Sequence, residues 1–318
     1  MNQPAEQPGS AKKANRLWLI PKALVSIVLL YLAFSSTDTA GAMAVISSIP
    51  AWAWLLGTLL VCAQIPQLAG RWTLVLSASG KHLAYARACS FTYTGYFFNQ
   101  ALPSSVGGDF MRAYLAWKDG LAFQPALASV FLERATGLFM LTLFSALLLR
   151  EEPIPLVSGL THWGMVVLVL VMAFAGLLLL ALLQWLASRI PGPARLVQFL
   201  AELGVQFLNL LRKRKLFMAV FLLGGLSSLT GATAMAVGAM SLDLPVTYLQ
   251  VVGISSLAIV ATVVPVSISG WGIRENVMIW LMTPLGVPAE QALGLSIWFG
   301  LVSIIAAIPG GVLWLKSD

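Results

Sequence analysis

Charged residues are scarce in this sequence: they make up 10% of the chain, against 59% hydrophobic residues. A soluble domain carries about 25% charged residues, so the composition excludes an ordinary soluble protein. Long apolar runs alternate with short polar segments, which predicts an all-α polytopic membrane protein. The net charge of +7 comes largely from basic residues in the short loops, where they act as topology signals and headgroup contacts. Nucleic-acid binding is therefore not expected.

Cysteine and histidine are also rare. The two cysteines, Cys62 and Cys89, and the two histidines, His82 and His162, show neither a disulfide framework nor the spacing of a metal site. The chain has no Walker motif for ATP, and no Ser, His and acid form a nucleophile pattern. We therefore expect no cofactor, no metal and no enzyme activity.

Apolar runs of about the length that a spanning helix needs recur along the chain. The polar residues 1–16 precede the first run and predict a disordered cytoplasmic tail. A cleaved signal peptide is the competing interpretation of that run. Residues 193–211 are amphipathic, which predicts an interfacial helix lying along the membrane. The six predicted spans are about 17–34, 50–69, 125–149, 163–187, 216–240 and 291–315.

Two stretches, 99–112 and 265–275, break the apolar pattern with Pro, Gly and charged residues. Polar groups at membrane depth are expensive and usually functional, and broken backbone there requires protein or a water-filled cavity beside it. The two stretches share one design at a separation of 162 positions. Pro103, Ser105, Gly108 and Arg112 correspond in order to Pro265, Ser267, Gly270 and Arg274.

The distribution of Lys and Arg predicts how these breaks sit in the membrane. If about 86–120 and about 248–287 are re-entrant hairpins and the N-terminus is cytoplasmic, 15 of the 19 basic residues fall inside and two outside. A full crossing at 86–103 would move the basic segment 188–215 outside, so the charge rule favours the first hairpin. It does not separate a second hairpin from two crossings, so eight spans remain the alternative to about six spans plus two hairpins.

The two halves of the chain then have matching designs. Residues 17–150 form membrane repeat A and residues 151–315 form membrane repeat B, followed by a cytoplasmic end at 316–318. Three crossings per half is an odd number, so the two repeats are inverted relative to each other. Broken segments at corresponding positions of inverted repeats indicate a transporter site. We therefore expect the two hairpins to meet near the middle of the bilayer.

The charged residues at the first break predict a site for a phosphate-bearing headgroup. Asp109 and Arg112 are three positions apart after two glycines, and backbone N–H groups at a helix start suit an anion together with an Arg. The alternative is a capped interfacial helix with a surface ion pair. Glu133 and Arg134 lie within a span, and one of them is expected to meet Arg112 or Asp109. They belong either to the substrate site or to a buried structural network.

The second break is less acidic than the first, because Trp271 stands at the position of Asp109. Trp271 is expected to pack on lipid or on a sugar or acyl group, and Asn99 to hydrogen-bond the backbone of the first hairpin. The predicted substrate-binding residues are Asn99, Pro103, Gly107, Gly108, Asp109, Arg112, Glu133, Arg134, Pro265, Gly270, Gly272, Arg274 and Glu275.

The sequence at the two breaks resembles the lysylphosphatidylglycerol synthase transmembrane-region family, also described as flippase-like integral membrane proteins. The resemblance covers about residues 17–315, and Ser269, where the family more often has Gly, departs from it. It rests on Asn99, Leu102-Pro103, Gly107-Gly108-Asp109, Arg112, Ser129-Val130, Glu133-Arg134, Pro265, Ser267, Gly270, Gly272 and Arg274-Glu275.

The resemblance implies an integral inner-membrane protein whose partners are membrane lipids. In bifunctional members such a domain is linked to moving aminoacylated phosphatidylglycerol between leaflets. Those members carry a soluble synthase domain after the membrane part, and this sequence ends at Asp318, so aminoacyl-transferase activity is not expected.

The leading interpretation is a lipid flippase or transporter of the inner membrane, with both termini cytoplasmic and anionic lipids as partners. It would move a phospholipid or another phosphate-bearing lipid. One alternative is a membrane-embedded enzyme that acts on a lipid or polyprenyl phosphate, with Glu133 or Asp109 as its acid/base. Another alternative is a non-transporting scaffold that supports partner proteins of cell-envelope synthesis.

Overall fold

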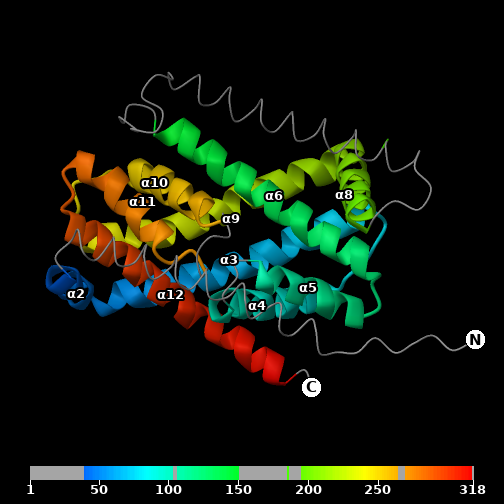
Figure 1. Cartoon of the computed structure of the whole chain (residues 1–318), viewed down its shortest axis with the longest axis horizontal. Helices are drawn as coiled ribbons and strands as arrows, with labels where there is room; N and C mark the ends of the chain where they lie inside the picture. Colours follow the sequence, from blue (N-terminus) through cyan, green and yellow to red (C-terminus); the bar gives the residue numbers. More distant parts are fainter. Residues whose placement is uncertain (1–38, 103–105, 150–184, 186–194, 264–268, 317–318) are drawn as a thin grey trace, which may run out of the picture.

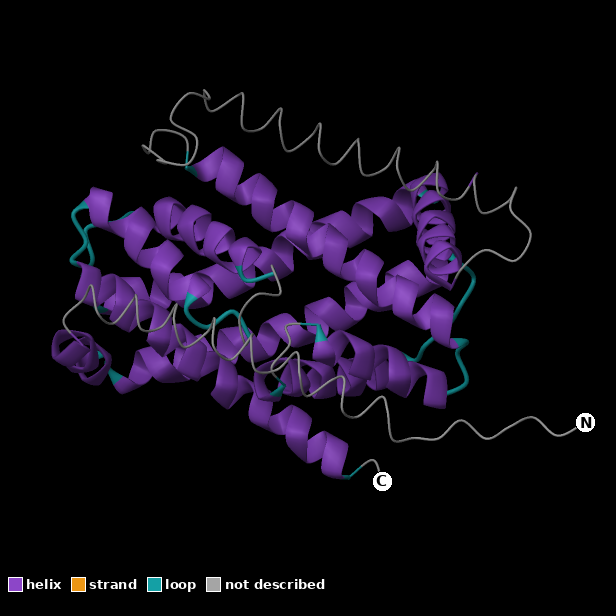
Figure 2. Cartoon of the chain, viewed as in Figure 1, coloured by secondary structure: helices purple, strands orange, loops and turns teal. Residues whose placement is uncertain are grey.

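The computed structural model describes residues 39–102, 106–149, 185, 195–263 and 269–316. All regular structure in these ranges is helical, and they contain no strand (Figures 1 and 2). The predicted all-α class is therefore confirmed for the described residues. The tail at 1–16 and the spans expected at 17–34 and 163–187 lie outside them.

Among the described residues, four helices are long and apolar enough to cross a membrane. Their 26 to 28 residues rise about 40 Å, and the hydrocarbon core of a bilayer is about 30 Å thick. Each contains most of one run that the sequence predicted as a span. The four helices are α3 (Ala51–Ala78), α6 (Phe123–Leu148), α9 (Arg214–Ser241) and α12 (Ala289–Leu315).

The span predicted at about 50–69 is too short, because α3 continues to Ala78. Gln64 lies within this helix, and its Nε2 donates to the backbone oxygen of Ser227 on α9 at 2.8 Å. Arg71 lies inside the helix and is 3% exposed. A polar residue inside this bundle can therefore continue a helix, provided that a neighbouring helix supplies its partner.

Each break lies between two shorter helices that return to the same end of the bundle (Figure 1). The first pair is α4 (Tyr85–Ala101) and α5 (Gly107–Lys118), and the second pair is α10 (Tyr248–Ala261) and α11 (Ile273–Met282). The two pairs enter from opposite ends. At about 1.5 Å per residue, α5 and α11 are too short to cross a layer of about 30 Å. This arrangement agrees with the two hairpins, whereas the inverted repeats and the number of crossings stay predictions.

The remaining helices lie at the two ends of the bundle. At one end, α8 (Arg195–Arg212) covers most of the predicted interfacial helix and packs on α6, where Gln206 donates to the backbone oxygen of Pro125 at 2.9 Å. At the other end, α2 (Thr39–Ser48) packs on α12, and the one-turn helix η2 (Thr283–Leu285) follows α11.

The outside of the bundle is strongly apolar, and several charged side chains are buried among the apolar residues of its interior. Large apolar residues are exposed on the outside of the bundle, such as Leu222 at 69% and Leu55 at 63%. Charged residues are buried inside it, including Asp109 at 4%, Arg112 at 5% and Glu133 at 2%. A large exposed apolar surface marks contact with a membrane or a partner, so the pattern agrees with an integral membrane protein.

Candidate functional site

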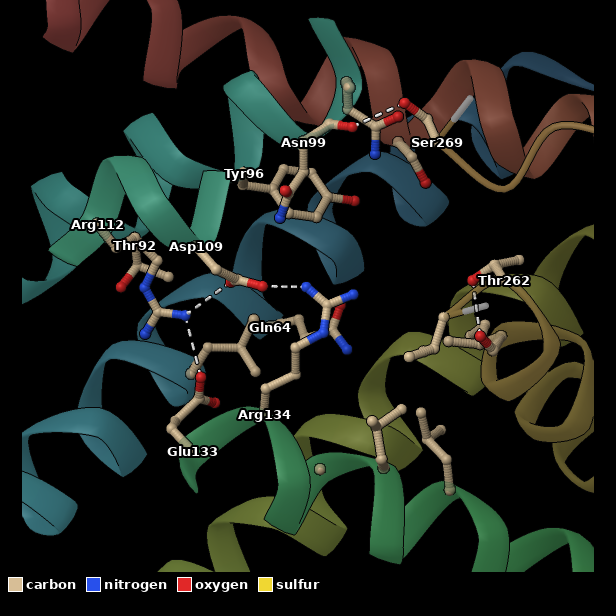
Figure 3. A pocket seen from close by; sticks show the side chains of 18 of the residues that line it. Gln64, Thr92, Tyr96, Asn99, Asp109, Arg112, Glu133, Arg134, Thr262 and Ser269 are labelled. Carbon is tan, nitrogen blue, oxygen red and sulfur yellow. Dashed lines mark hydrogen bonds and ion pairs between the residues drawn. The ribbon is translucent and has the colours of Figure 1, made fainter. Parts of the chain in front are cut away.

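A cavity of about 290 Å³, lined by both charged and apolar side chains, lies where the two hairpins meet (Figure 3). Its wall contains Asn99 and Asp109 from the first hairpin and Thr262 and Ser269 from the second, together with residues of α3, α6 and α12. The hairpins touch directly, because Oγ of Ser269 donates to the backbone oxygens of Asn99 at 2.8 Å and of Leu102 at 3.2 Å. The expectation that the two breaks come together is confirmed.

The first hairpin depends on a close crossing of two glycines. A Cβ atom added to Gly108 on α5 would lie 1.8 Å from the backbone oxygen of Gly95 on α4. The side chain of Asn99 fixes the start of α5, because its Oδ1 accepts a hydrogen bond from the N–H of Gly108 at 2.8 Å. This is the role predicted for Asn99. As a result, the first turns of α5 bring Asp109 and Arg112 to the cavity.

Glu133 is the centre of a buried cluster of three charged side chains. Its Oε1 accepts a hydrogen bond from Nε of Arg71 at 2.8 Å, and its Oε2 accepts one from Nη1 of Arg112 at 3.0 Å. None of the three is more than 5% exposed. The cluster ties together α3, α5 and α6. We call it the Glu133 clamp, and its burial favours the structural-network interpretation of Glu133.

The rest of the Arg112 side chain is incompletely satisfied. Its guanidinium carbon lies 4.6 Å from the ring centroid of Trp72, a cation–π contact. Its Nε and Nη2 atoms, and Oγ1 of Thr92 in the same cavity wall, are buried without a hydrogen-bond partner among the described residues. Buried polar atoms are hydrogen-bonded as a rule, so these three atoms indicate that the cavity holds a polar ligand or water.

Arg134, the neighbour of Glu133 on α6, pairs with the other carboxylate of the cavity (Figure 3). Nη1 of Arg134 contacts Oδ2 of Asp109. The other oxygen of Asp109, Oδ1, lies 3.8 Å from Nη1 of Arg112. The side chain of Arg134 is 24% exposed, against 6% for Arg112. The contacts predicted between this pair of α6 residues and the first hairpin are confirmed, and Arg134 is the more accessible of the two arginines.

The second break turns through a left-handed segment. Ser269, Gly270 and Gly272 have φ angles of +51°, +81° and +86°. Glycine adopts this region without strain, so Ser269 is the strained residue of this turn. The N–H of Gly272 donates to Oε2 of Glu275 at 2.6 Å and so caps the start of α11.

Arg274 is already neutralised by its neighbour. Its Nη2 donates to Oε1 of Glu275 at 2.7 Å, and its Nε donates to Oγ of Ser296 on α12 at 3.1 Å. The Trp271 ring packs on Arg274, with its centroid 5.0 Å from the guanidinium carbon, and its packing on lipid or on a sugar or acyl group stays a prediction. Arg274 lines the cavity, whereas Glu275 lies behind it and is 0% exposed.

The ionisable groups around the cavity carry a surplus of one positive charge. Four arginines and two carboxylates line it among the described residues, and Glu275 supplies a third carboxylate behind Arg274. The pair Arg274–Glu275 is neutral. The remaining arginines, at positions 71, 112 and 134, face Asp109 and Glu133. A buried site with this charge favours an anion of charge −1.

The outer face of α5 has the opposite character to its inner face. Asp109, Arg112 and the small residues between the helices are buried, whereas Phe110, Tyr114 and Trp117 are 42–50% exposed. The Phe110 ring packs edge-on against Phe131 of α6 at a centroid distance of 6.2 Å. A helix with charges inward and aromatic rings outward suits a position between a polar cavity and lipid.

Most of the predicted site residues take part in this arrangement, some in the cavity wall and others in its supports. Gly107 and Gly108 begin α5, and Gly270 and Gly272 form the second turn. Pro103 and Pro265 lie outside the described residues. The predicted residues that line the cavity are Asn99, Asp109, Arg112, Glu133, Arg134 and Arg274.

Several residues of the cavity wall were not predicted from the sequence. Gln64, Arg71 and Tyr96 are among them. Gln64 and Arg71 are seven positions apart, and two helical turns place them on one face, so this spacing within an apolar run was a usable signal. Within the described residues, no group of three or more His, Cys, Asp or Glu side chains could hold a metal ion.

The sequence was compared with known proteins and with known families. No curated protein matches it. Residues 19–311 match the family described as the lysylphosphatidylglycerol synthase TM region. That match includes every residue that lines the cavity. The chain therefore belongs to this family of membrane proteins related to lipid handling.

Proposed function

We propose that this protein is a transporter that moves a phosphate-bearing lipid across the inner membrane. The observation that carries the proposal is the surplus of one positive charge among the described ionisable groups around the cavity between the two hairpins. An uncompensated buried charge is costly, and a bound anion removes that cost. Arginine is well suited to a phosphate, because its planar N–H groups bind two oxygens at once.

The outside of the bundle supports a route for the apolar part of such a lipid. The first hairpin presents Phe110, Tyr114 and Trp117 outward, beside the buried Asp109 and Arg112. A lipid whose headgroup occupies the cavity can therefore keep its acyl chains in the bilayer, where they need no polar partners. The headgroup then crosses the membrane through the protein. It is the only part of the lipid that has to be desolvated.

The two hairpins are the proposed gates on the two sides of the cavity. They enter the bundle from opposite ends and touch through Ser269 and Asn99. Movement of one hairpin would open the cavity toward one leaflet, and movement of the other would open it toward the opposite leaflet. Broken helices that meet at a central site are the usual elements of alternating access in transporters.

The orientation of the protein follows from its exposed charges. Arg212, Lys213, Arg214 and Lys215 are consecutive, exposed and located at the end where the first hairpin enters. By the positive-inside rule this end is cytoplasmic, and such a cluster attracts anionic lipids of the cytoplasmic leaflet. The second hairpin then enters from the opposite side of the membrane.

The proposal is tested in vesicles that contain the purified full chain and a trace of acyl-labelled phosphatidylglycerol, whose transfer between leaflets is followed by a quencher outside the vesicle. We expect Arg134→Gln to reduce the protein-dependent transfer rate about 10-fold, since a charge-assisted hydrogen bond contributes roughly 1.5–3 kcal/mol. Arg87→Gln is the control, because Arg87 lies on the surface with its side chain 61% exposed. Equal rates for Arg134→Gln and the wild type would contradict the proposal.

The same vesicles separate the two alternatives. A covalent change in the lipid, detected by its mass, would favour a membrane-embedded enzyme, although Asp109 and Glu133 are both held by arginines. Stable co-purification of a protein of envelope synthesis, without any lipid transfer, would favour a scaffold.

A further inference from the structure

We infer that Asp109 sets the charge selectivity of the cavity, so that it accepts a phosphodiester headgroup in preference to a phosphomonoester. The inference rests on the proposed function, since it concerns the lipid that the same cavity binds. In this role Asp109 is a fixed counter-ion whose charge determines which phosphate binds. It does not itself contact the phosphate as a ligand.

The two carboxylates of the cavity are held differently. Both oxygens of Glu133 accept hydrogen bonds at 3.0 Å or less, from Arg71 and from Arg112. Asp109 has one oxygen on Arg134, and its other oxygen is 3.8 Å from Nη1 of Arg112, beyond hydrogen-bond distance. Glu133 is therefore part of the frame, whereas only one oxygen of Asp109 is in hydrogen-bond contact with an arginine.

The position of Asp109 places its charge where a phosphate would bind. It lies between Arg134, which is partly exposed, and Arg112, which keeps two buried N–H groups without a partner among the described residues. A phosphate oxygen that reached Arg134 would share this cation with Asp109. The negative charge of Asp109 therefore subtracts directly from the attraction between the cavity and the ligand.

The charge count then selects between two classes of lipid phosphate. With Asp109 ionised, the charges of Arg71, Arg112, Arg134 and the two carboxylates sum to +1 among the described residues around the cavity. A phosphodiester carries a charge of −1 and balances it. A phosphomonoester carries about −1.5 to −2 at neutral pH and leaves excess negative charge in a buried site, which is unfavourable. Removing the charge of Asp109 raises the surplus to +2 and reverses the preference.

The second half of the chain does not alter this count. Arg274 is bound by Glu275 at 2.7 Å, and Oε1 of Glu275 also accepts a hydrogen bond from Oγ of Ser296 at 3.1 Å. This pair is neutral and buried. The selectivity therefore depends on the first hairpin and α6. Of the two carboxylates there, Asp109 and Glu133, only Asp109 can be neutralised without breaking the Glu133 clamp.

The test uses the purified full chain in a non-ionic detergent at neutral pH. The probes are dihexanoyl phosphatidylglycerol, a phosphodiester, and dihexanoyl phosphatidic acid, a phosphomonoester. The dependence of thermal stability on the concentration of each lipid gives its Kd. We expect wild type to prefer phosphatidylglycerol, and Asp109→Asn to raise the affinity for phosphatidic acid relative to phosphatidylglycerol by about 10-fold or more.

Two further variants make the result specific. Asp243→Asn removes the same charge from an exposed loop residue outside the cavity, and should leave the ratio of the two affinities unchanged. Arg134→Gln lowers the surplus to zero and should weaken the binding of both lipids. This variant keeps the charge argument testable even if Asp109→Asn is poorly folded.

The outcomes separate this inference from the proposed function. If wild type binds phosphatidylglycerol but Asp109→Asn leaves the ratio unchanged, or weakens both lipids equally, Asp109 is a structural residue and the inference is wrong while lipid binding stands. The inference is also wrong if Arg134→Gln binds both lipids as wild type does. If wild type binds neither lipid above the detergent background, both the inference and the proposed lipid site are wrong.

Discussion

Arg71 on α3 and Glu133 on α6 form a buried ion pair, with 2.8 Å between Nε and Oε1 and both side chains 3% exposed. Arg112 of the first hairpin binds the other oxygen of the same carboxylate. A single glutamate therefore links the hairpin to two long helices, in addition to the contact between Asp109 and Arg134. These links help to fix the position of the hairpin and of the cavity beside it.

The first prediction concerns this clamp. Arg71→Ala should lower the free energy of unfolding by about 3–5 kcal/mol, because it leaves part of the Glu133 charge uncompensated in a buried site. Thermal unfolding of the purified protein in detergent measures the effect. Arg87→Ala is the matched control, since its ion pair with Asp119 is on the surface, where such pairs contribute about 1 kcal/mol or less. Similar effects of the two substitutions would show that the clamp is not structural.

The clamp also shows what sequence reasoning could not supply. The predicted span at 50–69 ended before Arg71, because an arginine after a proline and a glutamine resembles the end of a membrane helix. The structure instead buries Arg71 against Glu133, 62 residues away. Whether an intramembrane arginine is tolerated depends on a partner in another helix, and that partner is visible only once the helices are placed side by side.

Other parts of the site could be predicted because they follow from local chemistry. Gly107, Gly108 and Asp109 interrupt an apolar run, so a helix start with a carboxylate in its first turn was expected and is observed. The adjacent Glu133 and Arg134 project about 100° apart on a helix. The sequence predicted only that one of them meets Arg112 or Asp109. Both do, because Glu133 binds Arg112 and Arg134 binds Asp109.

The second prediction concerns the crossing of α4 and α5. Gly108→Ala should destabilise the protein by about 1–3 kcal/mol or more, because its Cβ would lie 1.8 Å from the backbone oxygen of Gly95. Gly225→Ala is the control, since a Cβ there meets its nearest atom, in the Phe144 ring, at 3.8 Å. Thermal unfolding of both variants measures the difference. Equal stability of the two variants would show that α4 and α5 do not cross this closely in the folded protein.

The third prediction concerns the contact between the hairpins. Ser269→Ala removes the hydrogen bonds to Asn99 and Leu102 but keeps the left-handed backbone, whereas Ser269→Gly removes the same bonds and relieves the strain. Strain of this kind costs on the order of 1 kcal/mol. Ser269→Gly should therefore be more stable than Ser269→Ala by about that amount in thermal unfolding. The opposite order would argue against the left-handed turn.

The fourth prediction concerns orientation. Lys215 and Thr283 are exposed at opposite ends of the bundle, and the positive-inside rule makes the end with Lys215 cytoplasmic. In a chain with Cys62 and Cys89 replaced, a membrane-impermeant maleimide should label Thr283→Cys in intact cells. It should label Lys215→Cys only after the membrane is permeabilised. The reverse labelling pattern would mean that the protein has the opposite orientation in the membrane. The first hairpin would then be the gate that faces outward.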